Sequence, residues 1–200
     1  GMDPYKHRLQ RYGCGCVLFP DPAVGRFYKH DSPSTYFSSK RLHLGEISLE
    51  CSRAGASAVA LWATQQLLPC ERGGTFAHGL ESGREAALEL YRRLRADPRF
   101  IAPASAPQLD IAFWAVRAKT PESSSLQAQR VFDEAARHDL HLALAKLPAT
   151  LFPAGTWKGS FDTEADVTCL RSVLMKPEHL AWLDEIWLRL DQATKLVMEE

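Results

Sequence analysis

Hydrophobic positions after residue 70 switch between a helical and a strand period. Apolar side chains recur every three or four residues from Thr75, the expected cap, to an Asp97-Pro98 stop, which predicts a helix. The elements predicted after it are strands at residues 100–102 and 109–116, a helix at 123–138, strands at 140–145 and 167–175, and a helix that opens at Pro177. This order favours a small mixed sheet with helices on one face.

The first part of the chain has a less regular pattern. Short apolar runs at residues 14–19 and 24–28, separated by a Pro-Asp-Pro turn, predict two strands joined by a tight connection. Residues 30–46 fit neither period and predict a loop. Residues 52–68 are rich in alanine and carry one charged side chain, Arg53, so they predict a helix that is buried on most sides.

Charge and hydropathy exclude several kinds of partner. Lysine and arginine together number 24, as do aspartate and glutamate, and no basic run is dense enough to track phosphates, which argues against nucleic acid. No stretch of about 18 apolar residues and no signal-peptide pattern is present, so we expect a cytoplasmic protein without a membrane partner. Gly1 before Met2 is typical of a scar left by tag removal, which would make Met2 the start of the gene product.

Cysteines and histidines do not combine into a metal site in this pattern. The five cysteines form one close pair and no second one, so reduced and mostly buried thiols are expected. No two histidines share metal-like spacing with a nearby carboxylate or thiol. The residues considered are Cys14, Cys16, Cys51, Cys70, Cys169, His7, His30, His43 and His141.

Several short segments in order resemble one enzyme family. They are Asp3-Pro4-Tyr5-Lys6-His7, then Gly13-Cys14-Gly15-Cys16-Val17-Leu18-Phe19, then the run from Gly45 to Arg53, and Ala60-Leu61-Trp62. Together they are similar to the group II pyridoxal-phosphate (PLP)-dependent decarboxylases, which include glutamate, aromatic amino acid and diaminobutyrate decarboxylases. The similarity continues through residues 170–173 and 179–182.

The resemblance implies a fold and a cofactor. The fold would be the C-terminal portion of an aspartate-aminotransferase-like (fold type I) PLP enzyme. Residues 1–70 would end the large PLP-binding domain, and residues 71–200 would form a small mixed-sheet α+β domain. The cofactor would be pyridoxal 5'-phosphate, and the substrate of the parent enzyme an amino acid, bound as a small molecule.

The same resemblance assigns the cofactor residues. Lys6 matches the family lysine whose amine forms an imine with the cofactor aldehyde. Tyr5 stands where the family usually has a histidine near the cofactor phosphate, and its hydroxyl can still donate a hydrogen bond. His7 completes this cofactor-binding segment.

Three further residues are candidates for work on the substrate. Tyr36 is the nearest match to the loop tyrosine that protonates the carbanion, and it is otherwise a surface aromatic. Arg53 matches a family arginine near the substrate carboxylate, and it is otherwise one half of a helix-terminal ion pair. Arg171 shares a strand face with Cys169 and Val173, an odd place for a charge unless it meets an anionic substrate or a carboxylate in a structural pair.

Other parts that the family needs would precede Met2. They are an aspartate against the pyridine nitrogen, a residue stacked on the ring and a small-residue phosphate loop. We therefore expect a decarboxylase fragment that is weakly active or inactive alone. The alternative is a non-catalytic dimerisation or binding domain, in which the residue 54–68 helix and the residue 14–19 strand expose apolar surface to a partner. We therefore expect a homodimer or larger assembly.

Overall fold

The computed structural model describes residues 4–7, 9–10, 14–29, 55–157 and 165–199, without the side chains of Tyr5 and His7. The chain divides into two compact units, Gly1–Pro69 (unit 1) and Cys70–Glu200 (unit 2), which are described separately below. Their assignment to two domains of a larger enzyme stays a prediction.

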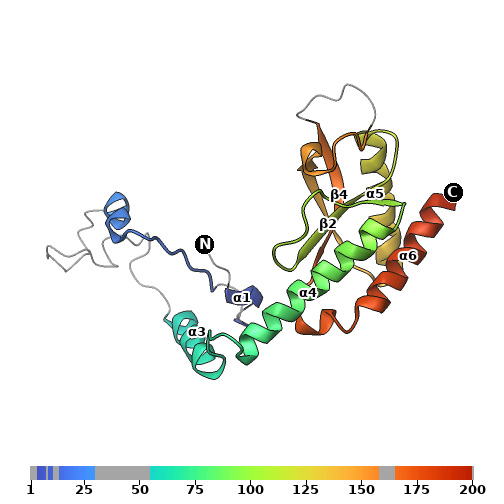
Figure 1. Cartoon of the computed structure of the whole chain (residues 1–200). Coiled ribbons are helices and arrows are strands. Elements are labelled where there is room, and N and C mark those ends of the chain that lie inside the picture. Colours follow the sequence, from blue (N-terminus) through green and yellow to red (C-terminus); the bar gives the residue numbers. More distant parts are fainter. Residues whose placement is uncertain (1–3, 8, 11–13, 30–54, 158–164, 200) are drawn as a thin grey trace, which may run out of the picture. The chain divides into compact units, whose positions relative to one another are not determined.

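Unit 2 follows the predicted order of helices and strands (Figure 1). Its elements are α4 (Thr75–Ala96), β1 (Phe100–Ile101), β2 (Ile111–Val116), α5 (Pro121–Arg137), β3 (Ala143–Pro148), β4 (Asp166–Val173) and α6 (Leu183–Glu199), with short 3-10 helices η2 (Ala149–Leu151) and η3 (Pro177–His179). The order was predictable because each long element carries its own amphipathic period.

The sheet of unit 2 has the strand order β1-β2-β4-β3, and every neighbouring pair is antiparallel. The prediction of a mixed sheet was therefore wrong, although the small α/β architecture is correct. Helix α5 follows β2 and brings the chain to β3 at the sheet edge, and the chain then returns antiparallel as β4 between them. Hydrophobic periodicity carries no information about strand direction, so the sequence could not settle this point.

The main core lies between one face of the sheet and the three long helices. Trp114 of β2 is fully buried there, and its ring meets Phe100 edge-on at 6.4 Å between centroids. Phe100 in turn meets Trp187 of α6 at 6.2 Å. The opposite sheet face is covered in part by Phe152 and Trp157, whose rings lie 5.5 Å apart. Each such buried aromatic side chain contributes roughly 1.5–3 kcal/mol to stability.

The observed helix starts in unit 2 differ from the predicted ones, and the capping residues show why. Thr120 caps α5, because its hydroxyl accepts from the Ser123 amide at 3.2 Å while the Ser123 hydroxyl accepts from the Thr120 amide at 3.0 Å. Thr75 is not a cap: α4 begins at that residue and Gly74 precedes it without a side-chain bond. Pro177 opens only η3, and α6 begins afresh at Leu183.

Two strand boundaries in unit 2 also differ from the prediction. The strand predicted at residues 140–145 lies at Ala143–Pro148, so Leu140 and Leu142 precede it. Strand β4 ends at Val173, two residues before the predicted end, although the Leu174 amide still donates to the Asp110 carbonyl at 2.7 Å.

Helix α4 approaches the end of β4 through a glycine. A Cβ on Gly83 would lie 2.7 Å from the Leu174 carbonyl oxygen, closer than real Cβ contacts allow. One turn earlier, a Cβ on Gly79 would lie 3.2 Å from the Pro177 ring. The helix can therefore pack this closely only because both positions lack a side chain.

Unit 1 contains α1 (Pro4–His7), η1 (Pro22–Tyr28) and α3 (Ala56–Leu67) among its described residues. The strand predicted at residues 24–28 is wrong: Asp21 accepts from the Ala23 amide at 2.8 Å and starts a 3-10 helix instead. The run at residues 14–19 forms a bridge only at Cys16, so the predicted strand is not present there.

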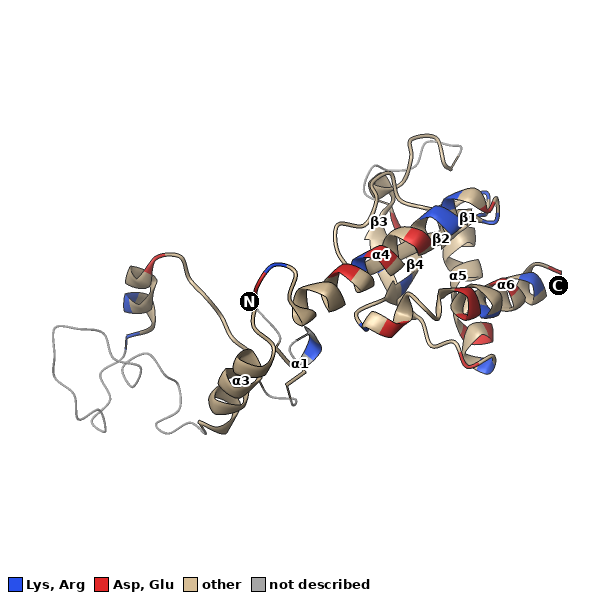
Figure 2. Cartoon of the chain, turned by 60° about the horizontal axis from the view of Figure 1, so that its bottom comes forward, with Lys and Arg blue, Asp and Glu red and all other residues tan. Residues whose placement is uncertain are grey.

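Helix α3 matches a predicted helix but not its predicted burial. None of its residues is buried, and Val59, Trp62 and Leu67 are 63, 62 and 81% exposed. In Figure 2 the ribbon of this helix is tan throughout, since its sequence has no lysine, arginine, aspartate or glutamate. Within unit 1, only the segment around Gln10 and Cys14 is bonded to it in the described structure, through Gln10 Nε2 to Thr64 Oγ1 at 2.5 Å and Cys14 Sγ to the Ser57 carbonyl at 3.7 Å.

Candidate functional site

Lys6 lies in the single turn of α1 and its side chain is exposed. The turn is held to the rest of unit 1 by the Gln10 amide, which donates to the Pro4 carbonyl at 3.2 Å, and by the buried Pro4 ring. The side chain of Gln10 continues this link to α3. Lys6 is therefore an exposed residue in a short segment that is anchored on both sides of its own turn.

The other candidates near Lys6 are described less fully. The backbones of Tyr5 and His7 belong to α1, and their side chains lie outside the described residues. Tyr36 and Arg53 also lie outside the described residues. Their predicted roles stay predictions.

Arg171 occupies the middle of the sheet. It pairs in register with Phe113 of β2 and Ala143 of β3, and by alternation it shares a face with Cys169 and Val173, as the pattern predicted. Its Nε is buried and has no hydrogen-bond partner, and no carboxylate of the described residues forms an ion pair with it. The structural pair considered from the sequence is therefore absent from the described part of the chain.

A pocket of about 280 Å³ lies where β3 begins and β4 ends, and Arg171 is one of its lining residues. Its other walls come from residues 140–143, residues 172–174, η3 and α6. His179 and Trp182 lie next to each other there, with ring centroids 6.5 Å apart. The Lys176 amide donates to His179 Nδ1 at 3.4 Å, which leaves Nε2 to carry the proton of the neutral ring.

Sequence reasoning did not find this pocket as a unit. His141 was considered only as a metal ligand, and residues 179–182 only as part of a family resemblance. The pocket depends on the point at which two strands diverge, so no single segment carries a signal for it.

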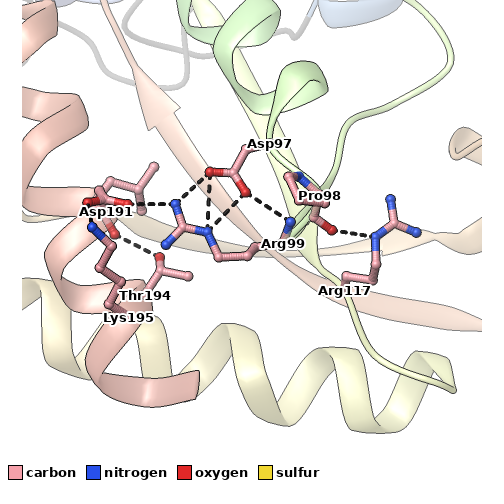
Figure 3. Close-up of polar contacts among 8 residues, drawn as sticks. Asp97, Pro98, Arg99, Arg117, Asp191, Thr194 and Lys195 are labelled. Atoms are coloured by element: carbon pink, nitrogen blue, oxygen red, sulfur yellow. Dashed lines mark hydrogen bonds and ion pairs between the residues drawn. The ribbon is translucent and has the colours of Figure 1, made fainter. Parts of the chain in front are cut away.

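Two other notable side chains, Arg99 and Cys169, have structural explanations. Arg99 lies between Asp97 and Asp191 and ties the start of β1 to α6 (Figure 3). Burial raises the pKa of the Cys169 thiol to about 12, which makes it a poor nucleophile. Across the described ranges, no three histidine, cysteine or acidic side chains gather as metal ligands, and no helix is both long and apolar enough to cross a membrane.

No family model matches the chain, and no curated protein does. Solved structures do match it. Mouse CSAD in its apo form has a TM-score of 0.64 and 15% identity, over 96% of this chain and 38% of that one. Oryza sativa TDC with PLP and tryptamine has a TM-score of 0.56 and 14% identity, over 78% of this chain and 30% of that one. Catharanthus roseus tryptophan decarboxylase in complex with L-tryptophan has a TM-score of 0.55 and 12% identity, over 87 and 33% of the two chains.

These structural neighbours are group II PLP-dependent decarboxylases. At identities of 12 to 15% the likeness shows the fold alone. The chain spans about a third of the length of each neighbour. It therefore has a fold that occurs as a portion of this class of enzyme.

Proposed function

We propose that the chain is the C-terminal part of a PLP-dependent amino acid decarboxylase, a carboxy-lyase. The observation that carries the proposal is the agreement between two independent features. The residues around Lys6 resemble the attachment segment of the group II enzymes, and the fold matches structures of that group. A chance resemblance of one short motif would not also make the fold similar over 96% of the chain.

The described residues fit one part of a PLP site. Lys6 is an exposed residue and carries a primary amine, the group that attaches an aldehyde cofactor. When bound, PLP supplies the electron sink for the negative charge left by loss of carbon dioxide. Tyr5 and His7 adjoin Lys6 in α1 and would contact the cofactor.

The substrate roles belong to residues farther along the chain. Tyr36 would deliver a proton to carbon, as the family's loop tyrosine does. Arg53 and Arg171 would pair with the substrate carboxylate, and the unpartnered Nε of Arg171 supports that role. The protein would act in the cytoplasm on an amino acid.

We further propose that this chain alone is weakly active or inactive. The chain spans about a third of each neighbour, and the family's ring aspartate, stacking residue and phosphate loop have no match in these residues. Without the aspartate the electron sink loses its counter-charge, and without the loop the phosphate loses most of its hydrogen bonds.

Release of carbon dioxide from amino acids tests the function. The assay uses the chain together with any polypeptide encoded in frame upstream, and a panel of acidic and aromatic amino acids. Activity that depends on added PLP is expected, and Lys6→Met should reduce it to background. The control Lys146→Met alters an exposed lysine on β3 and should leave activity unchanged. Full activity in Lys6→Met would refute the proposed role of this amine.

A second candidate is a non-catalytic dimerisation or binding domain. It is favoured by the exposure of Val59, Trp62 and Leu67 on the uncharged helix α3, because apolar surface of this kind is usually covered by a partner. We propose a homodimer or larger assembly. Sedimentation at micromolar concentration tests this, with Trp62→Glu expected to shift the protein toward monomer. A wild-type chain that sediments as a monomer would argue against the assembly.

A further inference from the structure

The pocket at the end of the sheet lies entirely within unit 2. Strands β3 and β4 pair from the Ala143 and Arg171 positions onward. Beyond that pair, residues 140–142 and residues 172–174 line opposite sides of a space of about 280 Å³, and Ile186 of α6 also lines it. A space of this size suits a small organic molecule.

The charges around the pocket favour a ligand with one negative charge. Arg171 is the only lining residue with a fixed charge, and none of the lining residues is acidic. Its Nε is buried without a hydrogen-bond partner. A buried guanidinium nitrogen that lacks a partner is costly, and a carboxylate is the group whose planar geometry satisfies it best.

The remaining walls favour a ligand whose body is apolar. Most of them are aliphatic, and His179 and Trp182 add aromatic surface. The aliphatic lining residues are Leu140, Leu142, Ala143, Val173, Leu174 and Ile186. A second carboxylate on the ligand would lie against these side chains without a fixed positive charge, and burying an unpaired charge is strongly unfavourable.

We infer that this pocket binds a monocarboxylate with an apolar or aromatic body and no second charge, such as a phenyl-substituted alkanoate, and disfavours dicarboxylates. The binding itself is a property of unit 2, because every lining residue belongs to that unit. Trp182 is 60% exposed, so its ring offers a stacking surface that a ligand would cover.

Titration with three small probes tests the inference on the whole chain without PLP. The probes are 3-phenylpropionate, its neutral alcohol 3-phenylpropan-1-ol, and the dicarboxylate glutarate. Binding is followed by amide NMR shifts, with those of residues 140–143 and 172–174 expected to move. Saturable binding of 3-phenylpropionate is expected, with the alcohol and glutarate at least about tenfold weaker, since one charge-assisted bond is worth roughly that ratio or more.

Two variants separate the role of Arg171 from a general effect on the sheet. Arg171→Met should weaken 3-phenylpropionate binding by roughly 10- to 100-fold and bring it close to the alcohol. Arg171→Lys keeps the positive charge, so its affinity for 3-phenylpropionate should fall less than that of Arg171→Met. The control Lys146→Met removes an exposed lysine on the neighbouring strand β3, whose Nζ lies 3.6 Å from Asp166 Oδ2, and should leave 3-phenylpropionate binding unchanged. Circular dichroism of each variant checks that the sheet is folded.

The inference is overturned if no probe saturates, if glutarate binds as tightly as 3-phenylpropionate, or if a folded Arg171→Met binds like the wild type. The experiments distinguish a wrong inference about the pocket from a wrong proposal about the decarboxylase function. Probe binding without PLP attachment at Lys6 would reject the decarboxylase and keep the pocket as a carboxylate site. Attachment at Lys6 without probe binding would reject the pocket alone.

Discussion

Replacement of Arg99 by methionine should release α6 from the start of β1. Arg99 Nη2 donates to Asp191 Oδ1 at 2.6 Å and to Asp97 Oδ2 at 2.5 Å, and Nε also donates to Asp97. The side chains of Arg99, Asp97 and Asp191 are only 22, 13 and 20% exposed. Figure 3 shows the guanidinium between the two carboxylates. The variant would leave both carboxylates half-buried without this partner.

The expected loss follows from the bonds removed. A hydrogen bond to a charged group contributes roughly 1.5–3 kcal/mol, and partial exposure reduces that, so two carboxylates together give about 2–4 kcal/mol. For a unit of this size the melting temperature should fall by roughly 8–15 °C. The matched control is Arg137→Met on α5, whose side chain is 73% exposed beside Glu134. An exposed pair contributes about 0–1 kcal/mol, so the control should change little.

The pH dependence of the same variant gives a second check. The hydrogen bond from Arg99 lowers the pKa of Asp97, and those from Lys195 and Arg99 lower the pKa of Asp191. Groups with a lowered folded pKa stabilise the protein above the unfolded pKa, about 3.9 for aspartate, and that stability is lost as the pH falls further. Urea unfolding should therefore show the largest gap between wild type and Arg99→Met near pH 6, and a smaller gap near pH 3. A gap no larger than that of Arg137→Met, or one constant with pH, would refute this account of the cluster.

Two smaller predictions concern packing and the buried thiol. Gly83→Ala should lower the free energy of unfolding of unit 2 in urea by about 1–3 kcal/mol, although alanine has the better helix propensity, because the new Cβ would lie 2.7 Å from the Leu174 carbonyl oxygen. Gly79→Ala should cost less, because its Cβ would meet only a carbon of the Pro177 ring, at 3.2 Å. Equal losses in the two variants would count against the close approach of Gly83 to Leu174. In native protein at pH 8, iodoacetamide should modify the exposed Cys70 quickly and Cys169 hardly at all, since the Cys169 pKa is about 12. Equal modification of the two thiols would contradict the burial of Cys169.

The sequence predicted unit 2 better than unit 1 for a physical reason. In unit 2 each helix carries its own apolar stripe, and the strands are short apolar or alternating runs, so the local pattern identifies the elements. In unit 1 the run at residues 14–19 needs a neighbouring strand to form a ladder, and a local cap at Asp21 turned residues 22–28 into a 3-10 helix. Strand direction and the start of β3 depended on long-range pairing, which periodicity does not contain.

The candidate site was predictable to a similar extent. Alternation along the strand predicted the face on which Arg171 lies. It could not predict that Arg171 has no carboxylate partner among the described residues. The pocket could not be predicted, because its walls meet only after β3 and β4 diverge and η3 turns the chain toward α6. The role of Lys6 was predicted from resemblance to a family and stays a prediction; the structure places this residue, exposed, in α1.

Reductive trapping of PLP is the most direct test of the central claim that Lys6 is the attachment lysine. The chain, joined to any polypeptide encoded in frame upstream, is incubated with PLP, reduced with borohydride and mapped by peptide mass spectrometry. A pyridoxyl group on Lys6, at higher occupancy than on every other lysine and absent from Lys6→Met, is the predicted result. Occupancy at Lys6 no higher than at the exposed Lys146 would contradict the claim.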